Sequence, residues 1–425
     1  MYTSDVACEV RKKAEMAKRA ARALRNLSRD TKDAALRAMA QALEDNENAI
    51  LESNSIDMAN GEKKGLGDAL LDRLKLNHAR IMAMAEGLRE LANLEDPVGT
   101  VSELTRRPNG LLVGKMRVPL GVIGFVFESR PNVTADTSGL CIKSGNAIIM
   151  RGGSEAYNSN RILTKLLADA AVSCGIPQGA IQLVESTDRE GVRALATSDD
   201  LIDLMIVRGG EQLVRAVSEY ATVPLIKHGK GLCHVYLDKD ADVAKAVEIA
   251  FNAKVDRPGV CNAMETLLVH KDIAQACLPQ LVARLCESGV ELVGCPRTVD
   301  LLKDHCDIKL ANDSDWDAEY LALKLSIKIV DSYEEAVDHI CSYGSGHTEA
   351  IVTENHSLAM QFLDDVDASV VLVNASTRFN DGFQLGLGAE LGISTQKLHA
   401  RGPMGLKELT CEKFVVLGQG QVREA

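Results

Sequence analysis

Cys261 stands in a sequence context that could support covalent chemistry. It follows the turn-forming pair Pro258-Gly259, Arg257 lies close before it, and a helical turn is expected after it. A helix N-terminus and a nearby cation both stabilise a thiolate, which is the reactive form of cysteine. The alternative is that Cys261 is a small buried apolar residue, as many cysteines are. Other cysteines fall inside or at the start of expected elements and fit that alternative: Cys233, Cys277, Cys286 and Cys341. The local context therefore makes Cys261 the candidate nucleophile.

A second signal is a cation beside glycine at the end of three expected strands. The segments are Arg151-Gly152-Gly153, Arg208-Gly209-Gly210 and Lys227-His228-Gly229-Lys230-Gly231. Open α/β sheets bind their ligands at the carboxyl ends of the strands. Glycine lets a phosphate approach the backbone, and a cation pairs with that phosphate. Solvated loop charges would explain any one of these segments, but together they predict a site for an anionic ligand.

The usual nucleotide and metal motifs are absent from the sequence. No segment matches G-x-G-x-x-G after a strand or G-x-x-x-x-G-K-[ST]. No two cysteines have C-x-x-C spacing, and the nine histidines form no i, i+4 pair with a nearby carboxylate. We therefore expect no metal, and a nucleotide, if one is bound, must be held by some other arrangement.

The elements that must position these residues change along the chain. Residues 1–94 carry apolar side chains at three and four spacing, which is typical of helices. After Pro97, two strand-like stretches flank Pro108-Asn109-Gly110 and predict a hairpin. Short apolar runs then alternate with helical stretches, which predicts βαβ units and a parallel sheet. The expected strands are 122–127, 147–150, 181–184, 204–207, 223–226 and 234–237, with helices at 159–174 and 211–221.

A second set of strands and helices follows Cys261 and predicts a second α/β domain. Its expected strands are 266–269, 325–330, 350–352 and 370–373, and its expected helices are 273–288, 333–341 and 357–363. The stretch 379–405 is rich in glycine and is expected to be a long functional loop. A last strand is expected at 411–417.

Composition and charge exclude several classes of protein. The chain has 425 residues, 46% hydrophobic and 25% charged, which is globular and long enough for two or three domains. Its net charge of −12 gives no footprint for nucleic acid. Eleven cysteines are an odd number, and they favour thiols in a reducing cytoplasm over a disulfide framework. No apolar run approaches the roughly 20 residues of a membrane helix, so we expect neither a membrane nor a nucleic-acid partner.

Several motifs resemble the aldehyde dehydrogenase superfamily. Val118–Gly124 together with Gly145–Arg151 resembles the opening of its cofactor domain, and Cys261 takes the place of its catalytic cysteine. Four further motifs resemble the branch that reduces an acyl phosphate of glutamate. They are Glu128–Asp136, Ile206–Gly210, Tyr343–Ile351 and Gly386–Thr395.

The resemblance implies an aldehyde dehydrogenase-like α/β fold. It would contain two parallel-sheet α/β domains and a small projecting β oligomerisation element. The NADPH-binding domain would comprise 1–102 and 119–232, the catalytic domain 233–402, and the oligomerisation element 103–118 and 403–425. Because that element pairs subunits in the superfamily, a homo-oligomer, dimer or tetramer, is expected.

The activity implied is NADPH-dependent reduction of L-glutamyl 5-phosphate to L-glutamate 5-semialdehyde and phosphate, the second step of L-proline biosynthesis. Glutamate 5-kinase, which makes the substrate, is a candidate partner. Cys261 would attack the acyl phosphate and hold a thioester that hydride then reduces. Hydrolytic relatives place a glutamate base in a segment that here reads Lys227–Gly231, without a carboxylate. An activated water would destroy the thioester, so its absence favours a reducing or phosphorylating enzyme.

For the oxyanion and the substrate, the resemblance leaves several candidates. The stretch from Pro119 to Arg151 is two residues shorter than the common spacing, so Arg130 and Asn132 both compete for the oxyanion role. Asn132 is favoured for the oxyanion and Arg130 for the phosphate or carboxylate of the substrate. Further candidates for the glutamyl moiety are Arg257, His347 and Arg378. Arg378 would pair with the α-carboxylate or else be a solvated charge.

For the cofactor, Arg151 matches the superfamily lysine at the adenosine ribose. A guanidinium there suits a 2′-phosphate, which favours NADPH over NADH. Arg208 and Gly209 match the loop near the pyrophosphate and nicotinamide. Glu319 matches the glutamate that holds the nicotinamide ribose, and the alternative is an exposed acid in an acidic run.

Two other functions compete with this one. A CoA-acylating or other phosphorylating aldehyde dehydrogenase would share Cys261 and the missing base, but a CoA enzyme would also need an adenine pocket. A non-catalytic binding or scaffold protein would keep the fold and have an ordinary Cys261.

Overall fold

The computed structural model describes residues 4–227 and 229–423. The chain divides into two compact units, here called unit 1 and unit 2. Unit 1 comprises Met1–His228, Gly386–Gly392 and Met404–Ala425, and unit 2 comprises Gly229–Leu385 and Ile393–Pro403. The chain therefore leaves unit 1 to form unit 2 and returns to unit 1 at its end.

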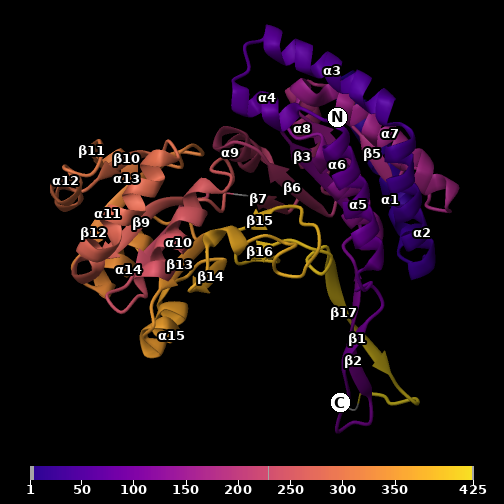
Figure 1. Cartoon of the computed structure of the whole chain (residues 1–425). Coiled ribbons are helices and arrows are strands. Elements are labelled where there is room, and N and C mark those ends of the chain that lie inside the picture. The colour runs from indigo at the N-terminus through magenta and orange to yellow at the C-terminus, as the bar shows by residue number, and fades with distance from the viewer. Residues whose placement is uncertain (1–3, 228, 424–425) are drawn as a thin grey trace. The chain divides into compact units, whose positions relative to one another are not determined.

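Unit 1 is built on a five-stranded parallel sheet in the order β5-β4-β3-β6-β7 (Figure 1). Its strands are β3 (Val122–Phe127), β4 (Ala147–Gly152), β5 (Ile181–Leu183), β6 (Leu204–Arg208) and β7 (Leu225–Lys227). All six residues of β3 are buried. Because side chains alternate across a strand, both faces of β3 must be covered, which explains why the strand reads as a continuous apolar run.

The first five helices of unit 1 form the start of the chain, as the sequence predicts, and the helices of this unit pack on the sheet or on one another. They are α1 (Asp5–Leu24), α2 (Arg29–Asp45), α3 (Glu47–Lys63), α4 (Asp68–Leu74), α5 (His78–Asn93), α6 (Asn132–Lys143), η1 (Ser154–Ala156), α7 (Tyr157–Ser173), α8 (Arg189–Ala196) and α9 (Glu211–Tyr220). Gly139 allows α6 to lie against α5, because a Cβ there would come within 2.5 Å of Leu88. No helix of the described residues is long and apolar enough to cross a bilayer.

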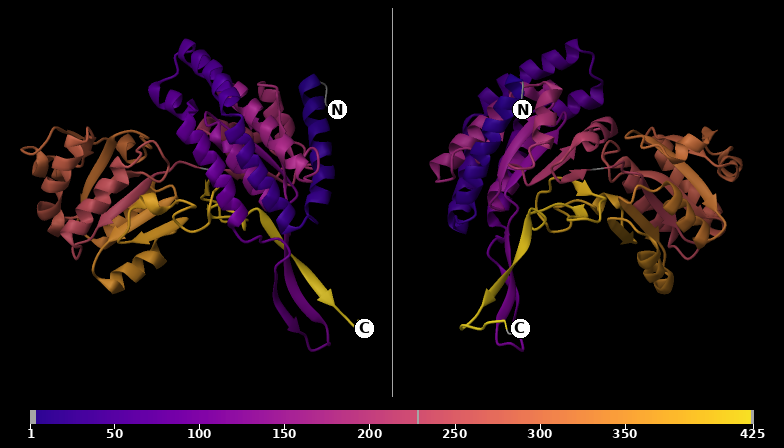
Figure 2. Two further views of the ribbon diagram at one scale, coloured as in Figure 1. Left: turned by 45° about the vertical axis from the view of Figure 1, so that its right-hand side comes forward. Right: turned by 180° about the vertical axis from the view of Figure 1, so that it is seen from behind.

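A separate antiparallel sheet also belongs to unit 1. It consists of β1 (Val101–Arg106), β2 (Leu112–Pro119) and β17 (Thr410–Leu417) in the order β1-β2-β17. The predicted hairpin is confirmed, and the last strand pairs with β2 from Thr410 opposite Pro119 to Leu417 opposite Leu112. Figure 2 shows this sheet extending away from the helices of unit 1.

Unit 2 is built on a seven-stranded parallel sheet in the order β11-β10-β12-β9-β8-β13-β14. Its strands are β8 (Cys233–Leu237), β9 (Met264–His270), β10 (Glu291–Gly294), β11 (Ile308–Leu310), β12 (Lys324–Val330), β13 (Thr348–Val352) and β14 (Val370–Val373). Its helices are α10 (Val243–Val255), α11 (Lys271–Glu287), α12 (Pro296–Leu302), α13 (Asp313–Trp316), α14 (Tyr333–Tyr343) and α15 (His356–Asp365). β8, which follows the first set of strands along the chain, pairs here with β9 and β13.

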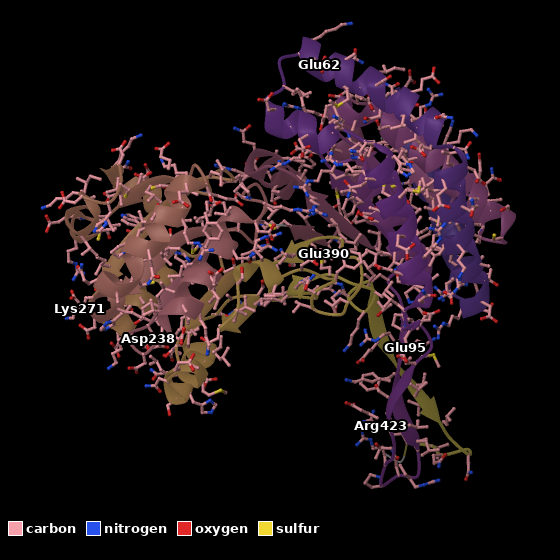
Figure 3. All side chains as sticks on the ribbon, viewed as in Figure 1. Glu62, Glu95, Asp238, Lys271, Glu390 and Arg423 are labelled. Atoms are coloured by element: carbon pink, nitrogen blue, oxygen red, sulfur yellow. The ribbon has the colours of Figure 1, made fainter. Side chains whose placement is uncertain are left out.

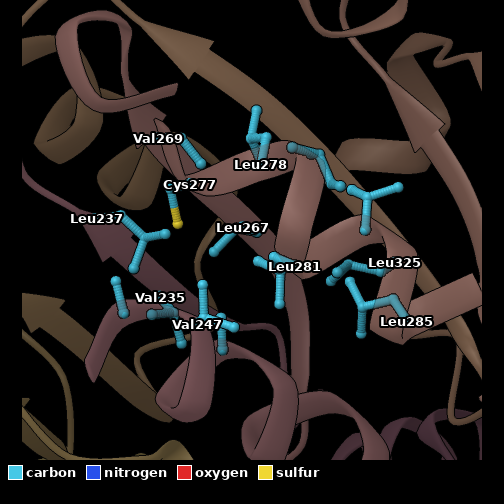
Figure 4. Packing of buried hydrophobic residues seen from close by; sticks show 14 of the residues in the cluster. Val235, Leu237, Val247, Leu267, Val269, Cys277, Leu278, Leu281, Leu285 and Leu325 are labelled. Atoms are coloured by element: carbon cyan, nitrogen blue, oxygen red, sulfur yellow. The ribbon is translucent and has the colours of Figure 1, made fainter. Parts of the chain in front are cut away.

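The core of unit 2 lies between β8, β9 and helices α10 and α11. Figure 4 shows Val235 and Leu237 of β8 packed with Leu267 of β9 and Leu281 of α11. Cys277 of α11 lies among these apolar side chains, as an inert cysteine would. Polar side chains occupy the outside, where Glu62 near the end of α3 and Lys271 at the start of α11 extend into solvent (Figure 3).

The glycine-rich stretch before the last strand has little regular structure, as predicted. It contains η2 (Thr377–Phe379) and the short strands β15 (Ile393–Ser394) and β16 (Gly402–Pro403), which pair with each other. Residues 386–392 of this stretch belong to unit 1, and residues 393–403 belong to unit 2.

A buried ion pair joins two helices of unit 1 and makes a test of its stability. Lys143 of α6 is fully buried and bonds Asp33 of α2. Lys143→Met removes the buried partner of the Asp33 carboxylate and leaves it with the exposed Arg29, whose Nε lies 3.3 Å away, so the free energy of unfolding should fall by about 3 kcal/mol in urea titrations. Lys165→Met breaks the exposed pair with Asp169 and should cost less than about 1 kcal/mol. Equal losses in the two variants would contradict this account.

Candidate active site

Cys261 lies in the turn that connects α10 to β9. The turn is closed by a hydrogen bond from the Ala263 N–H to the Val260 carbonyl oxygen (3.1 Å), and the Cys261 side chain is partly exposed. The expected helical turn after Cys261 is wrong, because β9 begins at Met264. The apolar run that follows the cysteine extends the sheet instead of starting a helix. The segment that follows Cys261 is therefore a strand, and it offers no helix N-terminus to stabilise the thiolate.

The residues that lead into β8 pack against one side of the Cys261 main chain. A Cβ on Gly231 would stand 2.1 Å from the Cys261 carbonyl oxygen, so only glycine fits there. The Cys233 thiol donates to the same carbonyl oxygen at 3.1 Å. The segment Lys227–Gly231, which contains no carboxylate, therefore contacts Cys261 through glycine. Within that segment, His228 lies outside the described residues.

Glu319 also contacts Gly231, through the backbone N–H of that glycine. Its Oε1 accepts the Gly231 N–H at 2.9 Å. Two residues later, the Leu321 N–H donates to Oε1 of Glu265 at 3.1 Å. The structure thus brings the predicted cofactor residue Glu319 close to Cys261 within one unit.

A buried ion pair supports this arrangement. Glu265 and Lys254 are at most 1% exposed, and their side chains meet at 2.7 Å. Burial raises the pKa of Glu265 to about 7 against the opposing effect of the Lys254 charge, and burial lowers the pKa of Lys254. Glu265 is the extra residue of a β-bulge, because Cys233 pairs with Met264 while His234 pairs with Thr266. The sequence analysis missed both Lys254 and Glu265. The signal that could have revealed them is a single charged residue inside each of two apolar runs.

Arg378 lies beside the residue that follows the cysteine. Its Nη1 donates to Oδ1 of Asn262, and its Nε lies 3.3 Å from Oδ2 of Asp256. The Asn262 amide in turn donates to the Asn380 carbonyl oxygen at 2.8 Å. Arg378 is therefore paired, and it lies close to Cys261 in space although the two are far apart in the sequence.

The other two candidates for substrate in unit 2 differ in exposure. Arg257 is exposed and has a φ of +55°, which few residues other than glycine adopt. His347 is fully buried, with its Nδ1 2.7 Å from the Thr348 hydroxyl and 3.6 Å from the Cys233 sulfur. An effect of His347 on a ligand must therefore pass through neighbouring residues.

In unit 1, the sheet register brings the predicted cations to one edge. Phe127 of β3 pairs with Gly152 on one side and with Arg208 on the other, and Val207 pairs with Lys227. All these strands are parallel, so their carboxyl ends lie together. The edge thus holds two of the cation and glycine segments that the sequence singles out, together with Lys227 of the third, whose glycines Gly229 and Gly231 belong to unit 2.

Arg151 is only partly free to bind a ligand at this edge. Its guanidinium donates to the carbonyl oxygens of Gly152 (3.1 Å) and Thr187 (2.6 Å), and its buried Nε has no hydrogen-bond partner. Burial lowers the pKa of Arg151, and the acidic side chains of Glu155 and Glu128 oppose that effect.

Two carboxylates that sequence reasoning missed lie at the same edge. Glu128 accepts the N–H of Gly210, the residue that precedes α9, at 2.9 Å. Glu155 accepts the N–H and the hydroxyl of Ser129 at 2.7 and 2.8 Å. A helix N-terminus is where a phosphate binds most readily. A phosphate at the start of α9 would therefore have to displace the Glu128 carboxylate.

Asn132, favoured for the oxyanion, begins α6 and is half-buried. Its amide donates to Oδ2 of Asp136 at 3.1 Å, one turn later. Burial raises the pKa of Asp136 to about 6, against the effects of the Asn132 hydrogen bond and the Arg208 charge. An amide has two N–H donors, so one remains for a ligand. Arg130, the competing candidate, is also half-buried.

The candidate residues thus fall into two groups. Unit 2 holds Cys261, Arg257, Glu319, His347 and Arg378, and unit 1 holds Arg130, Asn132, Arg151, Arg208 and Gly209. Within the described ranges, no group of three or more His, Cys, Asp and Glu side chains is arranged to hold a metal ion.

Comparison with known proteins identifies the family to which the chain belongs. Residues 2–292 match the model of the aldehyde dehydrogenase family. The gamma-glutamyl phosphate reductase of Moorella thermoacetica is 55% identical over 420 residues, which cover 99% of this chain and 100% of that protein.

Solved structures confirm the predicted fold. The crystal structure of gamma-glutamyl phosphate reductase from Thermotoga maritima matches with a TM-score of 0.94 and 45% identity, covering 98% of this chain and 100% of that chain. An engineered glycolyl-CoA reductase with bound NADP⁺ matches with a TM-score of 0.70 over 96% of each chain, and at 16% identity it shows the fold alone. The chain belongs to the aldehyde dehydrogenase family, among the gamma-glutamyl phosphate reductases.

Proposed function

We propose that the chain reduces L-glutamyl 5-phosphate to L-glutamate 5-semialdehyde with NADPH, through a thioester on Cys261, as the second step of L-proline biosynthesis. The observation that carries the proposal is the setting of Cys261. Its thiol is partly exposed, its main chain lies against Gly231 of a segment that contains no carboxylate, and Glu319, which does reach that segment, is bonded to the Gly231 N–H. This setting offers a nucleophile beside a segment that has no carboxylate base to activate water.

The chemistry divides into two steps. The Cys261 thiolate attacks the acyl carbon, the C–O bond to phosphate breaks, and a thioester forms. NADPH supplies the hydride that reduces this thioester, and the resulting oxyanion collapses to the aldehyde and the thiolate. One proton is taken up overall, because phosphate leaves as HPO₄²⁻. Splitting the reaction into two steps is the advantage of a covalent intermediate.

The polar residues around the two sites have distinct proposed roles. Asn132 would donate its second N–H to the oxyanion, and Arg130 would meet the phosphate or carboxylate of the substrate. Arg257 and Arg378 would bind the glutamyl moiety, with Nη2 of Arg378 available after Asn262 and Asp256 take its other nitrogens. His347 would act indirectly, since it is buried.

The proposed cofactor residues are Arg151, Arg208, Gly209 and Glu319. The unpartnered buried Nε of Arg151 and the cations at the strand ends fit a phosphorylated dinucleotide. The engineered glycolyl-CoA reductase holds NADP⁺, so the shared fold can accommodate a phosphorylated dinucleotide.

We place this activity in the cytoplasm, with glutamate 5-kinase as a further partner that supplies the substrate. All eleven cysteines are thiols in the described structure, in keeping with a reducing compartment.

The choice of acceptor tests the reaction. Oxidation of L-glutamate 5-semialdehyde with NADP⁺ should require phosphate, and Cys261→Ala should lower its rate by about a thousandfold or more. The rate is measured as NADPH absorbance with phosphate, with CoA, or with neither. Turnover that depends on CoA and not on phosphate would favour a CoA-acylating enzyme. Full activity of Cys261→Ala, without selective iodoacetamide labelling of Cys261 in the parent, would overturn the proposal altogether.

Arg151 provides the test of cofactor choice. A charge-assisted hydrogen bond contributes about 1.5–3 kcal/mol, so Arg151→Ala should raise the KM for NADPH roughly ten- to hundredfold and change that for NADH little. Steady-state kinetics with both cofactors measure the difference. Arg193→Ala, an exposed cation on α8, is the control for the lost charge. Equal losses for NADPH and NADH would mean that the 2′-phosphate binds elsewhere.

We also propose that the β1-β2-β17 sheet joins the chain to a second copy of itself. β17 pairs with a strand on one edge only, and its Phe414 and Val416 side chains are 71% and 53% exposed. An open edge beside exposed apolar side chains is a site for association.

Sedimentation velocity tests this association. Phe414→Glu combined with Val416→Glu should shift an oligomer to the monomer, because the charges oppose burial of the sheet. Leu310→Glu, on the edge strand β11 of unit 2 and 63% exposed, should leave the sedimentation unchanged. A monomeric parent protein, or an oligomer insensitive to the β17 changes, would refute this arrangement.

A further inference from the structure

We infer that Cys233 is a positioning residue for Cys261, because its thiol holds the main-chain carbonyl of the proposed nucleophile. The inference deepens the proposed function and rests on the nucleophilic role of Cys261. It assigns a purpose to a second cysteine that takes no part in the covalent steps.

The contact itself is specific. Cys233 is the first residue of β8, is fully buried, and donates its S–H to the Cys261 carbonyl oxygen at 3.1 Å. Burial, together with the negative charge of Glu349, raises the pKa of the Cys233 thiol well above its ordinary value. The sulfur therefore keeps its proton and remains a donor, while it stays unreactive as a nucleophile.

The segment that carries Cys233 is itself held in place. The N–H of Gly231 donates to Glu319 (2.9 Å) and that of Leu232 to the Ser345 hydroxyl (3.0 Å). The His234 N–H donates to Oε2 of Glu349 at 2.9 Å. Glu319 precedes β12, whereas Ser345 and Glu349 lie four residues apart at the start of β13, so two separate segments of unit 2 hold this backbone. The thiol of Cys233 thus stands on a fixed backbone and can orient its partner.

A buried histidine completes the surroundings of this thiol. Nδ1 of His347 lies 3.6 Å from the Cys233 sulfur and 2.7 Å from the Thr348 hydroxyl. The contrast is Cys277, which is equally buried but lies among apolar side chains of the α11 core. Cys233 is therefore a polar group in a polar setting, whereas Cys277 only fills space.

Holding the Cys261 carbonyl constrains the reacting thiol. The peptide group between Cys261 and Asn262 is planar, so fixing its oxygen fixes the whole plane. With Gly231 against the same main chain, the Cα of Cys261 has little room to move, since a Cβ on Gly231 would come within 2.8 Å of it. A misplacement of about 1 Å can cost on the order of a hundredfold in rate. Cys233 would thus act on kcat more than on substrate binding.

Three substitutions at Cys233 separate the hydrogen bond from packing. Cys233→Ala removes the donor, Cys233→Ser keeps a donor, and Cys233→Val fills the space and suits a strand without a donor. Loss of one such bond should lower kcat about five- to tenfold in the Ala and Val variants, with the KM values for semialdehyde and phosphate unchanged. Cys233→Ser should restore kcat to within about twofold of the parent.

Cys277→Ala is the matched control, because it removes an equally buried thiol that has no contact with Cys261. Its kcat should equal that of the parent, even if its stability falls as much as that of Cys233→Ala. Amide hydrogen exchange of peptides covering 257–263 gives a readout independent of activity. Exchange there should be faster in Cys233→Ala and Cys233→Val, and unchanged in Cys233→Ser and Cys277→Ala.

The outcomes distinguish this inference from the proposed function. Parent-like kcat and exchange in both Cys233→Ala and Cys233→Val would overturn the inference while Cys261→Ala remained inactive. An equal loss of kcat in Cys277→Ala would also overturn it, since the effect would then be one of packing. Full activity of Cys261→Ala would instead show that the proposed function has failed.

Discussion

The candidate chemistry of unit 2 depends on one close contact between two backbones, that of Gly231 with that of Cys261. A single added carbon at position 231 would collide with the Cys261 carbonyl oxygen. Around this contact, Glu319 holds Gly231 and Cys233 holds Cys261. The bulged residue Glu265 and its partner Lys254 secure the segment that carries Glu319. The arrangement is built from backbone groups, so its geometry depends on a glycine and on acidic side chains as well as on the proposed nucleophile.

Unit 1 presents a mixed edge in place of the purely basic one that the sequence indicates. Arg151 and Arg208 lie at the carboxyl ends of β4 and β6, the two parallel strands that flank β3, as predicted. Glu128 and Glu155 lie there too and already accept backbone N–H groups. An anionic ligand at this edge must therefore compete with carboxylates of the chain itself. Such competition lowers the affinity for anions in general. A ligand that also pairs with the arginines binds more tightly than one that does not.

Sequence reasoning succeeded where a local pattern sufficed and failed where distant residues had to meet. The apolar runs of β3 and β14 gave their boundaries directly, and Pro108-Asn109-Gly110 marked the hairpin. β10 was missed because Glu291–Gly294 is short and starts with a charge. The helical turn expected after Cys261 does not form, because the residues from Met264 onward pair with β8 as a strand. Glu128 and Gly210 are 82 positions apart, so no local pattern could reveal their bond.

The order in which the chain builds its two units has a consequence for synthesis on the ribosome. Unit 2 is complete at Pro403, whereas unit 1 still lacks Met404–Ala425 at that point. β2, made at residues 112–119, must wait for β17 at 410–417 before its second edge is paired. A nascent chain therefore carries an open strand edge while the roughly 290 residues between β2 and β17 are made, which at 5–20 residues per second takes roughly fifteen to sixty seconds. Residues made after unit 2 thus complete the sheet of the unit that was begun first.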